Sequence, residues 1–73
     1  GSGAVDHIAF FATGLEEKLQ QLKALNIPYQ ERTVPVIKLH QIFLVDPNGI
    51  VIELNYPAHE KAALDAKQRE QLK

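Results

Sequence analysis

The chain has 73 residues, 45% of them hydrophobic and 23% charged, a composition typical of one small globular domain or of a piece of a larger one. Eight basic and nine acidic residues give a net charge of −1, so its electrostatics favour neither nucleic acid nor an anionic membrane surface. It has no cysteine, which excludes disulfides, thiolate metal ligands and thiol nucleophiles. Because no apolar run approaches the roughly 18 residues of a membrane span and no signal-peptide pattern is present, we expect a cytoplasmic protein.

The first predicted element is a strand at residues 5–11. The three residues Gly1-Ser2-Gly3 resemble a cloning scar and are set aside. The segment VDHIAFF that follows is β-branched and aromatic, which favours a strand. Alternation places its residues on two faces: Val5, His7, Ala9 and Phe11 on one, and Asp6, Ile8 and Phe10 on the other.

A helix is predicted next. Thr13 and Glu16 have the spacing of a capping box, with Thr13 as N-cap and Glu16 at N3. Leucines at spacings of four, three and three residues form one apolar stripe over about three turns: Leu15, Leu19, Leu22 and Leu25. Asn26 suits the left-handed C-cap position and Pro28 prevents continuation, so the helix should end there.

Three further strands are indicated. Residues 29–34 form a polar segment between two prolines, which favours an edge strand. Residues 36–40 are ambiguous between loop and strand. Residues 41–45 and 50–54 have the composition of a hairpin joined by the turn signal Asp-Pro-Asn-Gly at 46–49, where Asp46 and Asn48 are explained by turn chemistry.

The chain ends in a polar segment. Pro57 stops the last strand, and residues 58–73 favour helix but have no continuous apolar stripe. We expect a solvated helix or a frayed tail there, after a module at residues 4–57.

The order β-α-β-β-β predicts an α+β fold with a mixed four-stranded sheet. A right-handed crossover places the helix on one face, where its leucines should cover Ile8, Phe10, Ile50, Ile52 and Leu54. The opposite face should carry His7, Ala9, Phe11, Val51 and Glu53. One helix cannot cover both faces, so this second face is either a cavity wall or an interface.

His7 and Glu53 are the principal candidates for chemistry on that second face. Glu53 lies between Ile52 and Leu54, where burial is costly unless the carboxylate is paired, protonated or bound to a metal. One interpretation is an edge strand whose outer side meets water. The other is a half-site for a divalent cation such as Zn, Ni, Co, Fe or Mn, which imidazole and carboxylate together suit. Two ligands are too few for a tight site, so the others would come from elsewhere.

Three phrases resemble the vicinal oxygen chelate superfamily, which contains glyoxalase I, the bleomycin and fosfomycin resistance proteins, extradiol dioxygenases and methylmalonyl-CoA epimerase. They are DHIAF at 6–10, LNIP at 25–28, and HQIFLVDPNG at 40–49 followed by IEL at 52–54. The last is the most specific. The resemblance covers residues 5–57 and implies one βαβββ module in which His7 and Glu53 are metal ligands.

Members of this superfamily normally carry two facing modules, whereas this chain has one and resembles the C-terminal half. The resemblance therefore implies a partner module, either from a missing N-terminal half or from a second copy in a dimer. It implies half of a metal-dependent lyase, isomerase or dioxygenase that chelates adjacent oxygens of a small-molecule substrate on a divalent ion. The alternative is a metal-free, drug-sequestering binder built from paired modules, but such a binder needs neither His7 nor Glu53. A third hypothesis is a fold fragment that associates through its open sheet.

Three other side chains are weaker candidates. His40 matches a phrase of the superfamily without matching a metal position, and we expect it at the surface or a pocket rim, with a substrate contact or an acid/base role as the alternative. Tyr56 follows the last predicted strand, where it would donate a hydrogen bond at a pocket mouth or pack at an edge. His59 lies in the polar segment, and no specific role is expected for it.

Overall fold

The computed structural model describes residues 7–71. The proposed cloning scar at residues 1–3 and the expected start of the first strand at Val5 and Asp6 lie outside the described residues. The elements follow the predicted order, and of the two forms expected for the C-terminal segment, a helix or a frayed tail, the helix is observed: β1 (His7–Phe11), α1 (Leu15–Ala24), β2 (Gln30–Val34), a 3₁₀ turn η1 (Pro35–Ile37), β3 (Leu39–Val45), β4 (Val51–Pro57) and α2 (Ala58–Gln71).

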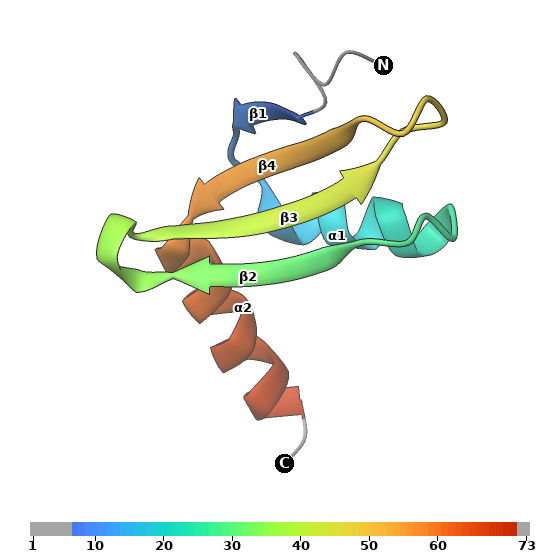
Figure 1. Cartoon of the computed structure of the whole chain (residues 1–73). Coiled ribbons are helices and arrows are strands. Elements are labelled where there is room, and N and C mark those ends of the chain that lie inside the picture. The colour runs from blue at the N-terminus through green and yellow to red at the C-terminus, as the bar shows by residue number, and fades with distance from the viewer. Residues whose placement is uncertain (1–6, 72–73) are drawn as a thin grey trace.

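The four strands form one mixed sheet in the order β1-β4-β3-β2. β1 runs parallel to β4, while β3 is antiparallel to both β4 and β2 (Figure 1). The α+β prediction is therefore confirmed, as is the edge position of β2. β4 is an interior strand, so the interpretation of Glu53 as a residue of an edge strand is wrong.

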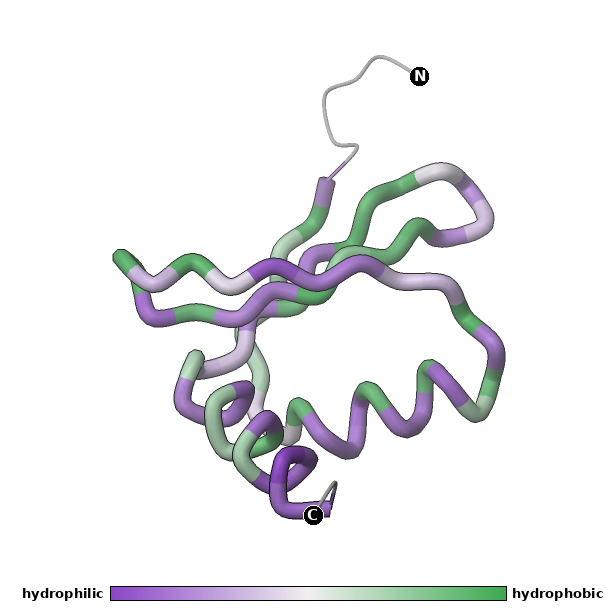
Figure 2. Tube along the Cα trace, turned by 90° about the horizontal axis from the view of Figure 1, so that it is seen from below, coloured by the Kyte–Doolittle hydropathy of each residue, from purple (hydrophilic) through white to green (hydrophobic). Residues whose placement is uncertain are grey.

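Both helices lie on one face of the sheet (Figure 2), where they close a single apolar core. Its buried members come from both helices and the two central strands: Leu15, Leu19, Leu22, Ile42, Tyr56 and Leu64. Ile8 and Phe10 on β1 stay exposed. The helices therefore do not cover this strand, contrary to the prediction. The core is therefore centred on β3 and β4.

The predicted leucine stripe is one residue too long. Leu25 is 60% exposed because it occupies the C-cap position, after the last helical turn. The end of α1 is otherwise as predicted, with Asn26 in the left-handed region at φ 57°. The amide of Asn26 donates to the carbonyl of Lys23 over 3.1 Å and that of Ile27 to the carbonyl of Leu22 over 2.9 Å. These two bonds form a Schellman motif.

The start of α1 differs from the prediction. The N-cap is Gly14, whose φ of 90° suits glycine, so the expected capping box of Thr13 and Glu16 is wrong. The acceptor for the first free amides is Glu60 in α2, whose Oε1 accepts from the amides of Gly14 and Leu15 over 3.0 and 2.9 Å. A carboxylate at this end also interacts favourably with the helix dipole. A side chain of α2 thus caps the N-terminus of α1.

The C-terminal segment is a packed helix over Ala58–Gln71. Most of its residues are exposed, as its polar composition predicts, but Leu64 is buried in the core beside α1. Lys67 pairs with Glu16 of α1 at 2.9 Å. Neither α1 nor α2 is long and apolar enough to cross a membrane.

The turn between β3 and β4 follows the predicted chemistry. Asp46 Oδ1 accepts hydrogen bonds from the amides of Asn48 and Ile50 over 2.8 and 2.9 Å. Gly49 adopts a positive φ of 83°, which a residue with a side chain rarely adopts. The turn fixes the register of the hairpin, in which Phe43 pairs with Glu53.

Candidate metal centre on the open face of the sheet

We call the side of the sheet opposite the helices the open face. His7 and Glu53 meet there, because β1 and β4 are parallel neighbours in which His7 pairs with Val51 and Ala9 with Glu53. His7 Nε2 lies 3.0 Å from Glu53 Oε1, with side-chain exposures of 51% and 16%. The structure therefore brings the two predicted residues together, while their role as metal ligands stays a prediction.

Glu53 receives further hydrogen bonds that compensate its partial burial. Its Oε2 accepts from Asn55 Nδ2 at 2.8 Å and from Gln41 Nε2 at 3.3 Å. These two amide side chains are only 2% and 5% exposed. The cost of burying a carboxylate between apolar neighbours is thus offset by two donors on one oxygen and His7 on the other.

The hydrogen bonds continue across the sheet to the edge strand β2. Gln41 Nε2 also donates to Asn55 Oδ1 at 3.0 Å, and Arg32 donates to Gln41 Oε1 through Nε and Nη2 at 3.2 and 2.9 Å. The Arg32 guanidinium also lies 5.6 Å from the centroid of the Phe43 ring, in cation–π range. We call these five linked residues the polar row: Arg32, Gln41, Asn55, Glu53 and His7.

Sequence reasoning missed three members of the polar row: Arg32, Gln41 and Asn55. The signal that could have found two of them is the hairpin turn, since its register pairs Gln41 directly with Asn55, one pair beyond Phe43 and Glu53 on the same face. Arg32 pairs with Gln41 in the same way. That contact follows only from the register of β2, which no tight turn marks.

The His7–Glu53 pair fits half of a metal site. The two atoms are hydrogen-bonded at 3.0 Å, close enough for both to reach one cation through ligand bonds of roughly 2.0–2.2 Å. The donors, one imidazole nitrogen and one carboxylate oxygen, suit a first-row divalent cation. No group of three or more His, Cys, Asp or Glu side chains able to hold a metal occurs among residues 7–71. Within residues 7–71 the candidate site therefore has two possible donor side chains, His7 and Glu53, and their role as ligands stays a prediction.

A groove of about 510 Å³ lies beside this pair. Val51, which lines it, is the direct register partner of His7. The other residues of the wall are mostly apolar: Pro28, Tyr29, Gln30, Phe43, Leu44 and Val45. The groove can hold the apolar part of a small molecule next to the two candidate ligands.

His40 lies on the other face of the sheet. β3 begins at Leu39, so the alternation turns His40 toward the helices, where it is buried. Its Nδ1 lies 2.7 Å from Thr33 Oγ1 and its Nε2 2.8 Å from Glu31 Oε1. The expectation of a surface or pocket-rim histidine is therefore wrong. Its two partners satisfy both ring nitrogens inside the fold.

Tyr56 is also on the helix face, paired with His40 in the register. It is fully buried in the core, so neither the pocket mouth nor the edge packing expected for it is observed. Burial raises the pKa of its phenol, and the nearby Glu60 carboxylate raises it further. His59 is exposed at the start of α2. None of these three residues lies with His7 and Glu53.

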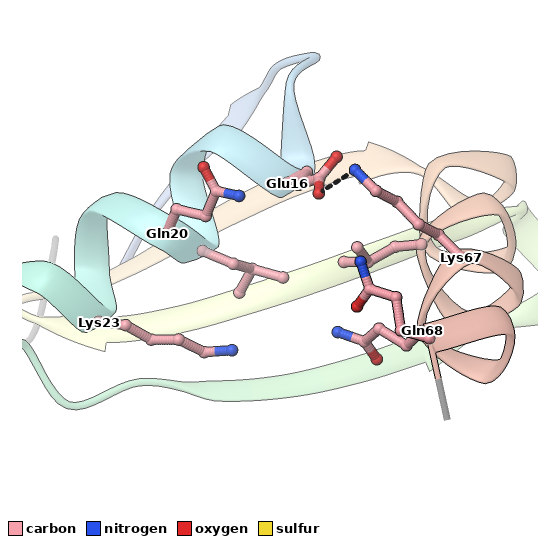
Figure 3. Close-up of a pocket in the computed structure, with 8 residues that line it drawn as sticks. Glu16, Gln20, Lys23, Lys67 and Gln68 are labelled. Atoms are coloured by element: carbon pink, nitrogen blue, oxygen red, sulfur yellow. Dashed lines mark hydrogen bonds and ion pairs between the residues drawn. The ribbon is translucent and has the colours of Figure 1, made fainter. Parts of the chain in front are cut away.

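A second hollow of about 270 Å³ lies between α1 and α2 (Figure 3). Its walls are mainly polar side chains, with Leu19 and Leu64 as its apolar part: Glu16, Leu19, Gln20, Lys23, Leu64, Lys67, Gln68 and Gln71. The Lys67–Glu16 ion pair links the two helices there. The lining contains no imidazole and only one carboxylate, so it lacks the donors that make the open face a candidate metal centre.

Comparison with known proteins supports the class of fold. No protein-family model matches the chain, and no curated protein matches it significantly. Among solved structures, it is similar to the genomically encoded fosfomycin resistance protein FosX from Listeria monocytogenes, with 26% sequence identity and a TM-score of 0.59. The similarity covers 68% of this chain and 44% of FosX, so this chain spans less than half of that protein.

The fold and this similarity confirm the predicted resemblance. The chain is a single βαβββ module of the vicinal oxygen chelate type, followed by the helix α2.

Proposed function

We propose that the chain is half of a metal-dependent site that acts on a small molecule by chelating its adjacent oxygens on a divalent ion. The observation that carries the proposal is the approach of His7 Nε2 to Glu53 Oε1, 3.0 Å apart on the sheet face opposite α1 and α2. The similarity to a resistance protein of the same superfamily supports it.

Each residue near the pair has a distinct task. His7 Nε2 and Glu53 Oε1 would hold the ion, which when bound supplies Lewis acid chemistry toward oxygens of the substrate. The walls of the groove, including Phe43 and Val51, would bind the apolar part of the substrate and exclude water. Gln41 and Asn55 donate to Glu53 Oε2 and so hold the carboxylate in place.

The remaining ligands would come from a second βαβββ module facing this one, supplied by another copy of the chain or by a further segment of the same protein. The coverage of 44% of FosX leaves room for such a module. The open face also presents large apolar side chains, among them Phe11, which is 77% exposed.

Metal analysis tests the proposal. If two copies of the chain pair and complete the site, the protein, loaded with Zn²⁺, Ni²⁺, Co²⁺, Fe²⁺ or Mn²⁺ and freed of excess by gel filtration, should retain a stoichiometric ion. His7→Ala and Glu53→Gln should each abolish retention and leave the helical circular dichroism intact, because neither residue belongs to the core. His59→Ala, a change of an exposed histidine on α2, is the matched control and should retain the metal. Equal retention by all four proteins would contradict the proposal.

One observation favours a second candidate function, a metal-free binding module. His7 and Glu53 already satisfy each other by a hydrogen bond, and the groove beside them is mainly apolar. The two functions differ in their response to chelators. A small molecule that binds through the ion is released by EDTA, whereas one held by the groove alone stays bound in equilibrium dialysis.

A further inference from the structure

We infer that Arg32 on the edge strand β2 is a positioning residue for Glu53 on β4, acting through the amides of Gln41 and Asn55. The inference rests on the proposed function insofar as Glu53 is a metal ligand. The contacts themselves belong to the polar row, a continuous set of hydrogen bonds that crosses the four strands of the sheet.

Arg32, at the outer end of the polar row, sets the direction in which its hydrogen bonds are donated. A guanidinium group only donates hydrogen bonds, so Gln41 must present its oxygen to Arg32. Gln41 Oε1 accepts two bonds from Arg32, at 3.2 and 2.9 Å. The amide nitrogen of Gln41 therefore points the other way, toward β4, where it reaches Asn55 and Glu53.

The same reasoning orients Asn55. Its Oδ1 accepts from Gln41 Nε2 at 3.0 Å, so its nitrogen faces Glu53 Oε2 at 2.8 Å and the carbonyl of Phe10 at 3.2 Å. Both amide nitrogens thus end on the same oxygen of Glu53. The other oxygen, Oε1, is left to His7.

This arrangement decides which carboxylate oxygen faces a metal. Second-shell donors orient a ligating carboxylate and tune its affinity, typically by 10- to 100-fold. Two donors on Oε2 favour coordination through Oε1 alone, beside His7 Nε2. Arg32 is therefore coupled to the candidate site although it lies two strands away from Glu53.

Burial makes the orientation of the amides costly to change. Gln41 and Asn55 are 5% and 2% exposed, so an unpaired group there loses its hydrogen bond without gaining one from water. A group that accepts at position 32 would attract the nitrogen of Gln41 and turn its oxygen toward Glu53. The carboxylate would then face a partial negative charge in place of a donor.

Three substitutions test the inference. Arg32→Glu replaces the donor by an acceptor, Arg32→Met removes the donor, and Arg32→Lys keeps one. Titration of each protein with Zn²⁺ in a calorimeter should show affinity reduced about tenfold or more by Arg32→Glu, less by Arg32→Met, and nearly restored by Arg32→Lys. Arg69→Glu makes the same change of charge on the exposed part of α2 and should leave the affinity unchanged. Circular dichroism checks that each variant is folded.

A second measurement needs no metal. In ¹⁵N-labelled protein, Arg32→Glu should shift the side-chain amide resonances of Gln41 and Asn55 and the ring nitrogens of His7, since these groups share the polar row. Arg69→Glu should shift none of them. Unchanged His7 and amide resonances in a folded Arg32→Glu protein would overturn the inference, as would equal Zn²⁺ affinity in all variants.

The two proposals fail in different ways. If wild-type protein that pairs in solution binds no metal while Arg32→Glu moves the His7 and amide resonances, the proposed function fails and the positioning of Glu53 by Arg32 stands. If His7 and Glu53 hold the metal but no variant at position 32 changes its affinity, the proposed function stands and the positioning role fails.

Discussion

The two faces of the sheet are built from the same strands but carry side chains of different kinds. On the helix face, α1 and α2 enclose an apolar core. On the open face, the same strands carry a row of hydrogen-bonded polar groups and several exposed apolar side chains. Alternation along β4 makes the division sharp, since Leu54 and Tyr56 face the core while Glu53 and Asn55 face the polar row. Substitutions on one face should therefore affect stability, and those on the other should affect binding.

His40 shows that polarity alone does not mark the face that carries the candidate site. It is buried on the helix face, yet Thr33 and Glu31 pair with both of its ring nitrogens. His7 has only Glu53 as its partner among the described hydrogen bonds and keeps half of its side chain exposed. The two histidines differ in access to a ligand, and this difference makes His7 the candidate.

The largest expected effect belongs to the helix face. Leu22→Ala should lower the free energy of unfolding by about 2–5 kcal/mol, since it truncates a buried leucine. That loss approaches the whole stability expected of so small a core. The matched control is Leu25→Ala at the C-cap of the same helix, where the side chain is 60% exposed and the loss should be small. Equal thermal midpoints for the two variants would contradict the position of the core.

The next effect concerns the open face and a second copy of the chain. If two copies pair through this face, the protein at tens of micromolar should scatter light as a species larger than its 8.2 kDa chain. Phe11→Asp should restore the 8.2 kDa species, because it places a charge in the apolar part of the interface. Val36→Asp, at an exposed apolar residue in η1, should leave the association intact. A compact wild-type monomer at these concentrations would rule out pairing of copies.

The contact between the helices provides a smaller effect on the helix face. Glu60→Ala removes the acceptor for the first amides of α1 and should cost about 0.5–2 kcal/mol, the usual range for a lost N-cap. Glu70→Ala, at an exposed position of the same helix, is the control and should cost much less. Urea denaturation of the two variants measures the difference. Equal costs would mean that Glu60 does not stabilise α1.

Local patterns in the sequence predict a large part of this structure. The Asp46–Gly49 turn, the C-terminal end of α1 at Asn26 and the shared face of His7 and Glu53 all follow from short-range rules of spacing. The shared face of His7 and Glu53 was expected from the period of two along each strand and from a helix covering the other face. It holds because β1 pairs with β4 in a register that sets Ala9 opposite Glu53.

The failures involve contacts between distant residues. Glu60 caps α1 across a sequence separation of 46 positions to Gly14 and 45 positions to Leu15, and no local capping motif encodes such a contact. Thr13 and Glu16 have the spacing of a capping box, but in the structure the carboxylate of Glu60 caps the helix in place of Thr13. The burial of His40 depended on where β3 begins, which the ambiguous residues 36–40 left open. Arg32 enters the polar row only through the register of β2.

The smallest expected effect appears at alkaline pH and concerns Tyr56, which lies on the helix face of β4. Burial raises the pKa of the Tyr56 phenol, and the Glu60 carboxylate adds to the shift. As the pH rises past the ordinary tyrosine value of about 10, the unfolded chain releases this proton before the folded one does. The unfolded state then binds fewer protons, so the contribution of Tyr56 to stability, complete below that pH, is lost as the pH rises through the higher folded value.

Urea midpoints measured between about pH 8 and about pH 11 should fall less steeply for Tyr56→Phe than for the wild type. Glu60→Gln should reduce the slope only in part, because burial is the larger cause. Identical slopes for all three proteins would mean that the Tyr56 phenol ionises as readily in the folded state as in the unfolded one, contrary to its place in the core.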